Sequence, residues 1–550
     1  MTTRTPFPWE ARYPPGICWD APIATTSLGE HLAVSVARHG DRVALVYREA
    51  RIGYAALGAM VRRAAAVFLG MEEAWGGVGL LLPNSPWHSV AFFGAASAGV
   101  RLMQMSPLDA ERELAHKLED SGARVLVTLA EDGLLRRARA LQARGLVDRL
   151  VVADDARWGG PAAGVGVPEG AVDFAQALDA AVPGELPAVD KHSVALLQYT
   201  GGTTGLPKGA MLTHANLTAA ANIQSYWRGG AEPDGERVVH VLPLFHIFAL
   251  TSLNRHLGMG NTVLLRQRFE VGQCLDDIEQ FRATTIAGVP TMWIAMANHP
   301  SIEARDLSSL RWPSSGGAPL PVEVEARFAR LTGTRLRGGW GMTETAPAGT
   351  GHPMRGESKM GSIGLPLPNV EMQVVALDDP YRVLGPGETG EFSIRGPNVM
   401  AGYWNKPEEN VAAFADGFFL TGDVGHMDAE GFFFLTDRKK DMILSGGFNV
   451  YPRVIEEAIY EHPDVAECVV IGVKDEYRGQ SAKAFVVLHP GAAGLTLEAL
   501  VGFLAERVGR HEMPVALECR DSLPRTAVGK LSKLMLMAEA DAAAPTKGET

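Results

Sequence analysis

Residues 198–212 read QYTGGTTGLPKGAML, a stretch of small residues with one lysine. Consecutive glycines can turn their backbone N–H groups toward an anion, and Thr203, Thr204 and Lys208 add hydroxyl donors and a positive charge. The stretch therefore predicts a phosphate-binding loop, with a plain surface loop as the alternative. Its spacing is not that of the G-x-x-x-x-G-K-[ST] loop, because Lys208 follows a proline and precedes another glycine.

Length and composition bound the possible answers. The chain has 550 residues, more than one hydrophobic core normally organises, so at least two domains are expected. Apolar residues make up 46% and charged residues 21%, which is ordinary for a globular protein. The net charge of −12 argues against nucleic-acid binding. The 4 cysteines lie far apart without a C-x-x-C pair, which disfavours a disulfide framework or a cysteine zinc site.

The N-terminus and the apolar runs predict a cytoplasmic protein. The first residues, MTTRTPFPWEARYPPG, contain no apolar core, so no signal peptide is expected. The longest mostly apolar run, VAFFGAASAGV at 90–100, is too short to span a bilayer and predicts a buried helix. Peripheral contact with a membrane stays open.

Helical and strand patterns alternate along most of the chain. RRAAAVFLGMEE (62–73) and ERELAHKLEDSG (111–122) have helical spacing, while GVGLLLPNS (77–85) and ARVLVTLA (123–130) are typical of buried strands. Two such α/β units are expected, over about 30–180 and 194–350, each with a parallel sheet covered by helices. Short strands punctuated by Gly and Pro over 361–435 predict a small antiparallel barrel or sheet.

The C-terminal part predicts a separate unit. DRKKDMILSGG at 437–447 is charged and ends in glycines, which is typical of a linker, and a compact α+β pattern follows it. The expected architecture is α/β: an N-terminal domain over 1–436, with two doubly wound subdomains and the small β-barrel, a linker over 437–447 and a small α+β domain over 448–550.

Six further stretches accompany the loop in a fixed order. They are LPLFHIFAL (242–250), SSGGAPLP (314–321), GWGMTET (339–345), LTGD (420–423), DRKKDMILSGGFNVYP (437–452) and LPRTAVGKLSK (523–533). Together with YTGGTTGLPKG, they resemble the motifs of the adenylate-forming superfamily, which includes acyl-CoA synthetases, luciferases and peptide-synthetase adenylation domains. The resemblance runs from about Asp41 to Lys533. It implies a ligase that uses ATP to turn a carboxylic acid into an acyl adenylate, releases pyrophosphate and passes the acyl group to a thiol.

The resemblance implies roles at the phosphate end of the nucleotide. Thr343 would contact the α-phosphate, and Glu344 would hold Mg²⁺ together with Thr204, since this hard cation suits one carboxylate plus phosphates. The loop residues would hold the β- and γ-phosphates: Thr200, Gly201, Gly202, Thr203, Thr204, Gly205 and Lys208. The alternative for Glu344 is an exposed loop carboxylate.

The resemblance also implies a nucleoside site. Gly317, Ala318, Pro319 and Gly339 would adjoin the adenine. Trp340 stands where the family commonly has tyrosine; an indole stacks on a base at least as well but lacks the phenol hydroxyl. Asp423 would accept hydrogen bonds from both ribose hydroxyls, although an Asp after a Gly is by itself more often a turn residue. Arg438 would contact the ribose or a phosphate.

Lys530 resembles the catalytic lysine of the family. Its ammonium would bridge the attacking carboxylate and the α-phosphate, where a compact cation stabilises developing charge; the alternative is a solvated tail lysine. Since Lys530 lies beyond the linker, the small domain must be mobile, closing for adenylation and then rearranging. The resemblance places the hinge at Lys440 and the pantetheine arm of coenzyme A beside Gly446 and Gly447.

The sequence determines least about which acid the chain would use. The motif strings resemble bacterial fatty acid:CoA ligases most closely, which implies a medium- to long-chain fatty acid. His246 would line the acid tunnel and move between half-reactions, with Val289, Trp293 and Gly316 beside it, although Val289 and Trp293 read equally as core residues. A dicarboxylic or aryl acid stays open, and so does a homodimer.

Three other functions compete with an acyl-CoA synthetase. An acyl-AMP ligase would load a carrier protein instead of CoA. A non-catalytic acyl or nucleotide sensor would be expected to lack Lys530, Glu344 or Asp423, and all three are present. A kinase-type or motor nucleotide hydrolase is disfavoured by the lysine spacing of the loop.

Overall fold

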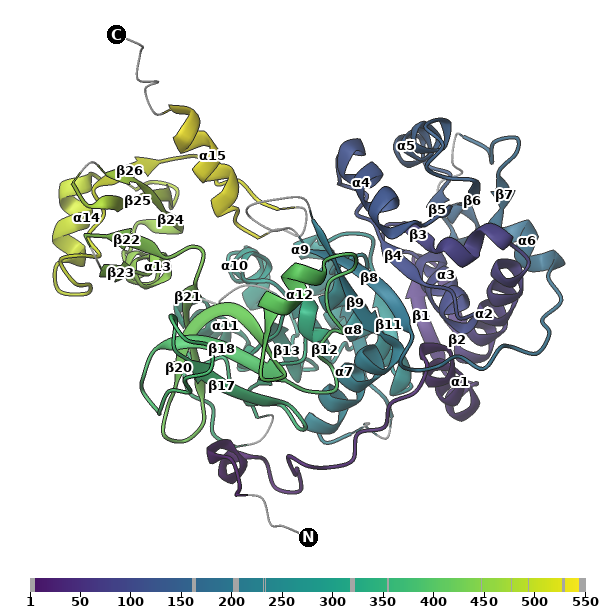
Figure 1. Ribbon diagram of the computed structural model, residues 1–550, viewed down its shortest axis with the longest axis horizontal. Coiled ribbons are helices and arrows are strands. Elements are labelled where there is room, and N and C mark those ends of the chain that lie inside the picture. Colours follow the sequence, from purple (N-terminus) through teal and green to yellow (C-terminus); the bar gives the residue numbers. More distant parts are fainter. Residues whose placement is uncertain are drawn as a thin grey trace.

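The computed structural model describes residues 5–160, 165–200, 207–230, 232, 234–316, 322–353, 356–446, 448–475, 477–492, 494–526 and 530–543. Figure 1 shows a large domain, coloured purple to green, and a smaller yellow-green domain at one side of it. The large domain contains two mixed sheets and an antiparallel one, and the small domain is built on a fourth sheet.

Within the described residues, one sheet of the large domain has 7 strands. Their order is β7 (Val172–Asp173), β6 (Arg149–Ala153), β5 (Val125–Leu129), β3 (Val78–Leu81), β4 (Leu102–Gln104), β8 (Val194–Thr200) and β9 (Lys208–Thr213). All neighbours are parallel except β8 and β9, which form an antiparallel pair. Residues 201–206 connect β8 to β9, so the phosphate loop predicted from the sequence joins two strands.

A second sheet has 9 strands among the described residues. Their order is β16 (Leu365–Pro366), β15 (Thr350–Gly351), β14 (Arg337–Trp340), β13 (Trp312–Ser315), β12 (Thr285–Gly288), β10 (Arg237–His240), β11 (Thr262–Leu265), β1 (Val43–Tyr47) and β2 (Ala50–Gly53). The strands from β14 to β1 are parallel, as the alternating pattern predicts.

The boundary predicted between the two α/β units is wrong in one respect. The early strands β1 and β2 belong to the second sheet, where β1 pairs with β11, and the later strands β8 and β9 belong to the first. Each half of the chain thus contributes strands to the other sheet. Strand pairing is a long-range property that a local pattern does not contain, so a local pattern leads to contiguous units.

Helices fill the space around these sheets. They are α1 (Leu28–His39), α2 (Tyr54–Leu69), α3 (Pro86–Ser97), α4 (Glu111–Ser121), α5 (Asp132–Ala143), α6 (Phe174–Ala180), α7 (His214–Trp227), α8 (Ile247–Gly258), α9 (Val271–Gln280), α10 (Pro290–Ala297) and α11 (Val322–Thr332). Every residue of α3 is buried, which explains the apolar run noted in the sequence. In the described part of the chain, no helix is long and apolar enough to cross a membrane.

The antiparallel sheet follows the second mixed sheet. It contains β17 (Glu371–Val375), β18 (Gly390–Arg395), β20 (Phe418–Met427) and β19 (Phe414–Ala415) in that order, with β21 (Phe433–Arg438) paired to β20 and helix α12 (Pro407–Ala413) beside it. The predicted antiparallel strands are confirmed. The predicted barrel is not, since no pairing among the described residues closes the path from β17 back to β19 or β21.

The small domain is the α+β unit predicted after the linker. Its sheet contains β23 (Phe448–Val450), β22 (Ile443–Ser445), β25 (Gly479–Leu488), β24 (Val465–Asp475) and β26 (Ala516–Cys519), with helices α13 (Pro452–Tyr460), α14 (Leu497–Leu504) and α15 (Lys533–Ala543). In Figure 1, α15 lies on the side of this domain that faces the large domain.

Candidate active site

The loop rich in glycine and threonine lies in a hairpin. Thr200 ends β8 and pairs across the hairpin with Lys208, which begins β9. A G-x-x-x-x-G-K-[ST] loop leads from a strand into a helix, so the different lysine spacing belongs to a different connection. Pro207 stands just before β9, where its missing N–H costs no ladder bond. The expected phosphate ligands Gly201, Gly202, Thr203, Thr204 and Gly205 lie outside the described residues.

The Lys208 ammonium lies among side chains from a distant segment. It forms an ion pair of 2.6 Å with Glu409 and lies 5.3 Å from the centre of the Tyr403 ring. Backbone bonds from Trp404 to Gly209 and from Met211 to Gly402 hold the segment beside β9. The lysine is therefore positioned at the mouth of the hairpin without being buried.

Tyr403 in turn contacts the carboxylate of Glu344. The phenol donates a hydrogen bond of 2.8 Å to Glu344 Oε1, and Glu344 is only 5% exposed. Burial raises the pKa of the Glu344 carboxyl, while the bond from Tyr403 partly opposes this. A cation beside this carboxylate would relieve the cost of the buried charge.

The short helical turn that carries Glu344, Thr343–Thr345, is held from several sides. Asn398 donates from its amide nitrogen to the carbonyls of Thr345 and Ala348, each at 2.7 Å. Ala346 ends the turn with φ of 48°, a left-handed conformation that a non-glycine residue adopts only when its surroundings enforce it. Thr343 and Glu344 therefore have fixed backbone positions.

Trp340 and Asp423, both expected at the nucleoside, contact each other. The Trp340 indole nitrogen donates a 2.7 Å hydrogen bond to Asp423 Oδ2, and Arg438 Nε lies 2.9 Å from Oδ1. Asp423 and Arg438 are cross-strand partners on β20 and β21. The Asp423 carboxylate raises the pKa of Arg438, and Asp423 itself is 2% exposed. Gly339 precedes this group on β14, so close to Thr350 that a Cβ would lie 2.7 Å from its carbonyl oxygen.

Lys530 reaches this group from the small domain. Its carbonyl accepts from Thr526 N at 2.7 Å, and its own N–H donates to the Thr526 hydroxyl at 3.2 Å, closing a tight loop. Burial and, to a smaller extent, the nearby Arg438 lower the pKa of the Lys530 ammonium to about 8, while Asp423 partly opposes them. The structure thus brings residues more than 100 positions apart into one charged cluster.

His246 lies at the other edge of the same cluster. Burial lowers the pKa of its imidazole to about 3, with a further contribution from the Lys530 charge. Its Nδ1 accepts from Phe248 N at 3.3 Å, and a Cβ on Gly316 would lie 2.9 Å from the Phe248 ring. A ring that stays neutral suits a wall of an acid pocket and not a proton carrier at neutral pH.

The other expected tunnel residues lie deeper. Val289 caps α10 and is 4% exposed, and Trp293 is fully buried, edge-to-face with Phe328 at 5.0 Å. The Trp293 ring also fills the space above Gly288, where a Cβ would meet it at 3.0 Å. Both residues therefore pack in the core, which is the alternative role that their residue types suggested.

The linker passes from one domain to the other over a few residues. Lys439 still belongs to the large domain, since its ammonium pairs with Glu391 at 2.8 Å and its N–H donates to the Gly422 carbonyl. Ile443 begins β22 of the small-domain sheet. Lys440, Asp441 and Met442 are therefore the connecting residues. Lys440 is one of them, and its role as the hinge stays a prediction.

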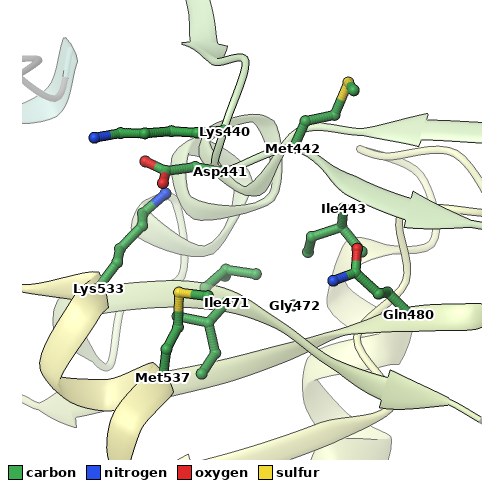
Figure 2. Close-up of a pocket in the computed structure, with 10 residues that line it drawn as sticks. Lys440, Asp441, Met442, Ile443, Ile471, Gly472, Gln480, Lys533 and Met537 are labelled. Atoms are coloured by element: carbon green, nitrogen blue, oxygen red, sulfur yellow. The ribbon is translucent and has the colours of Figure 1, made fainter. Parts of the chain in front are cut away.

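Figure 2 shows a small pocket at this connection. The Lys440 side chain points away from the others, whereas the Asp441 carboxylate points toward the ammonium of Lys533 on α15. Burial raises the pKa of Asp441 despite this neighbour. The apolar side of the pocket is formed by Met442, Ile443, Val470, Ile471, Gly472 and Met537.

Contacts across the linker hold the two domains together. Arg453 on α13 donates from Nη1 to the Leu435 carbonyl and from its backbone N–H to Asp437 Oδ2, each at 2.8 Å. Lys533 lies 3.9 Å from Asp437 Oδ1 and 3.1 Å from Glu456. Leu435, Asp437, Arg453 and Lys533 are called the interdomain clasp below. Gly446, expected beside the pantetheine arm, has φ of 58° on the far side of the linker, and Gly447 lies outside the described residues.

Some residues of the site were missed in the sequence. Tyr403, Glu409 and Arg453 contact expected site residues or the linker but belong to none of the quoted motifs, except that Arg453 directly follows one. The signal for Tyr403 was an aromatic pair in AGYWNKP, which lies between β18 and the start of α12. Gly317, Ala318 and Pro319, expected at the adenine, lie outside the described residues.

The donor set fits magnesium held together with a nucleotide. Among the described residues, no group of three or more His, Cys, Asp or Glu side chains could hold a metal ion by itself. A single buried carboxylate, Glu344, with phosphate oxygens and water completing the shell, is the arrangement that Mg²⁺ prefers.

Known proteins resemble the chain over nearly its whole length. Residues 32–404 match the family model of the AMP-binding enzyme, and residues 454–530 match the AMP-binding enzyme C-terminal domain. A long-chain-fatty-acid–CoA ligase of Bacillus subtilis is 36% identical over 552 residues, covering 97% of this chain and 98% of that one. A feruloyl-CoA synthase of an Amycolatopsis species is 36% identical over 521 residues, covering 93% and 96%. The crystal structure of ATP-bound MatB from Rhodopseudomonas palustris has a TM-score of 0.85 at 27% identity, covering 94% of this chain and 99% of that one.

Proposed function

Because the chain belongs to the AMP-binding enzyme family and is an AMP-forming acid–CoA ligase, we propose that its acid is a medium- to long-chain fatty acid. The proposal is supported by the similarity to long-chain-fatty-acid–CoA ligases, one of which is 36% identical to this chain. The observation that carries the roles below is that Lys530, Asp423, Arg438 and His246 act on one another electrostatically across two domains.

In the first half-reaction, a carboxylate oxygen of the acid bonds to the α-phosphorus of ATP, and the bond to pyrophosphate breaks. Lys530 is placed to neutralise both the carboxylate and the α-phosphate, charges that must approach each other in the transition state. Thr343 holds the α-phosphate and Asp423 holds the ribose. Lys208 exchanges its partner Glu409 for the leaving pyrophosphate.

Magnesium, bound by Glu344 and by phosphate oxygens, would supply positive charge at the phosphates during this step. Tyr403 fixes the Glu344 carboxylate by donating to Oε1, so one oxygen is oriented before any cation arrives. Thr204 of the hairpin loop is the second residue proposed for this ion.

In the second half-reaction, the thiol of CoA attacks the acyl carbonyl, and AMP leaves with the electron pair of the broken C–O bond. Lys530 would block the thiol while it sits beside Asp423, so the small domain turns about Lys440. Gly446 and Gly447 then offer a wall without side chains along the pantetheine arm.

A screen of acids tests the substrate proposal. The purified chain is given ATP, Mg²⁺, CoA and one acid at a time, and the release of AMP is measured with saturated fatty acids from short to long, with dicarboxylic acids and with ferulic acid. The largest kcat/KM is expected for fatty acids of medium to long chain. A larger value for an aryl or dicarboxylic acid would overturn the proposal.

The acceptor is tested in the same assay. An enzyme that uses free CoA forms the thioester only when CoA is present, and AMP appears at the same rate as the thioester. If acyl-AMP accumulates in the presence of CoA and no thioester forms, a carrier protein is the acceptor instead.

A further inference from the structure

The two oxygens of the Asp423 carboxylate have unequal surroundings. Oδ2 accepts the hydrogen bond of 2.7 Å from the Trp340 indole nitrogen. Oδ1 is buried and accepts no hydrogen bond from the described residues, although Arg438 Nε lies 2.9 Å away as an ion pair. One oxygen is thus taken by a neutral donor, and the other keeps its capacity to accept.

The Trp340 side chain has no room to point elsewhere. Its ring lies edge-to-face against Phe392, with centroids 6.2 Å apart, and a Cβ on Gly349 would lie 2.4 Å from the ring. Its backbone N–H donates to the Thr350 hydroxyl at 3.2 Å. Because the ring is enclosed on several sides, the direction of the indole N–H is set before any ligand binds.

The carboxylate is held just as firmly. The backbone N–H of Asp423 donates to the Thr421 hydroxyl at 3.1 Å, and the side chain is 3% exposed. Rotation about its terminal bond would change the plane of the carboxylate and the direction in which its oxygens accept. A donor that binds one oxygen from a fixed direction holds that plane.

We propose that Trp340 is a positioning residue for ribose recognition, acting through its indole N–H on Asp423. This rests on the proposed function, in which Asp423 accepts from the ribose. Trp340 binds Oδ2 and so holds the plane of the carboxylate, which leaves Oδ1, the oxygen beside Arg438, to accept a ribose hydroxyl. A tyrosine or phenylalanine ring could stack on adenine equally well but has no N–H at this position.

The competing role for Trp340 is stacking on adenine alone. The two roles separate with 2′,3′-dideoxyATP, which keeps the base and the triphosphate and lacks both ribose hydroxyls. A stacking residue contributes equally to the binding of ATP and of the dideoxy analogue. A residue that positions Asp423 contributes only to the binding of ATP.

The test uses the full chain with Trp340→Phe and Trp340→Tyr, measured by acid-dependent exchange of pyrophosphate into ATP. The wild-type chain is expected to have a KM about tenfold or more above that of ATP for the dideoxy analogue, the size of one hydrogen bond to a charged group. Both variants should raise the KM for ATP by about tenfold and leave the KM for the analogue within about twofold. Equal increases for both nucleotides would overturn the proposal.

A double-mutant cycle ties the effect to Asp423. Asp423→Asn is made alone and together with Trp340→Phe, and the Tm of every variant is recorded. In the Asn background, the Trp340 substitution should leave the KM for ATP within about twofold, because the carboxylate it positions is gone. A further tenfold loss there would contradict the proposal, whereas an unchanged KM for ATP in Asp423→Asn alone would contradict the proposed function.

Discussion

The two halves of the candidate active site are built differently. In the large domain, Trp340, Asp423, Glu344 and Tyr403 are buried or half-buried and bonded to one another or to the backbone. In the small domain, the backbone of Lys530 accepts a hydrogen bond from the Thr526 N–H and donates one to the Thr526 hydroxyl. Its meeting with the large domain depends on the linker and on the interdomain clasp.

This difference assigns a different task to each half. Groups that are already in place bind the nucleotide without reorganisation, which is how preorganised sites stabilise charge at low cost. A group that arrives with a mobile domain acts only in the conformation that delivers it, so it can be withdrawn for the second half-reaction. Substitutions in the large domain should therefore impair nucleotide binding, whereas those in the small domain should separate the two half-reactions.

Lys530→Ala should have the largest effect and separate the half-reactions most clearly. Acid-dependent pyrophosphate exchange is expected to fall by about 1,000-fold, because the charge between the carboxylate and the α-phosphate is lost. Conversion of supplied acyl-AMP and CoA to the thioester should change by less than about threefold, since the proposed rotation of the small domain withdraws Lys530 in that step. Equal losses in both assays, or unchanged exchange, would contradict the assignment.

Glu344→Gln should have the second-largest effect on pyrophosphate exchange, and the size of this loss should depend on the magnesium concentration. Glutamine keeps the acceptor for the Tyr403 phenol but removes the charge that would hold the cation, so exchange should fall by about 100-fold. The concentration of Mg²⁺ at half-maximal rate should rise as well. Tyr403→Phe is the matched control: it removes only the orienting bond and should cost no more than about tenfold. An unchanged Mg²⁺ requirement in Glu344→Gln would exclude the metal role.

The pH dependence of kcat/KM should show a smaller effect, which concerns Lys530 in the small-domain half of the site. The Lys530 pKa is lowered from its ordinary value to about 8, so its ammonium loses the proton as the pH rises through that value. If the charged form is required, kcat/KM for ATP should decline about tenfold per pH unit above it, because kcat/KM reports the free enzyme. Lys530→Arg keeps its charge throughout this range and should lack that decline, even if its rate is lower.

The residues on which these predictions rest could be predicted from the sequence to different degrees. Local signals predicted local features well: the helix at 111–122 ends at Gly122, whose φ of 70° suits a helix end, and the strand at 123–130 is present as β5. The resemblance singled out Asp423, Arg438 and Lys530 from their motifs alone, and the fold brings the three together.

Contacts between residues that lie far apart in the chain could not be predicted from the sequence. Strand β11, which pairs with β1, and Glu344, which accepts from Tyr403, lie more than 50 residues from these partners, and nothing in either segment indicates them. The bond from Trp340 to Asp423 joins two strands of different sheets, 83 positions apart. A motif reports which residue types a site requires, but the pairings among them come from the packing.

The smallest predicted effect concerns the interdomain clasp. Its contacts would determine how often Lys530 lies beside the large domain. Arg453→Met removes the guanidinium bond to the Leu435 carbonyl and keeps the length and apolar contacts of the side chain. Since one hydrogen bond from a charged group is lost across the linker, the closed arrangement should become less populated by up to about tenfold. Pyrophosphate exchange should then slow by about three- to tenfold, while the thioester half-reaction from supplied acyl-AMP stays equal or becomes faster.

Glu457→Gln is the control for this prediction, because Glu457 pairs with Arg453 within α13 and does not cross the linker. It should leave both half-reactions within about twofold. If Arg453→Met slows both half-reactions equally and lowers the Tm, the arginine serves the stability of the small domain alone. If exchange slows and the thioester step does not, the contacts made across the linker set the balance between the two domain arrangements. Arg453 then determines how often Lys530 reaches the preformed half of the site in the large domain.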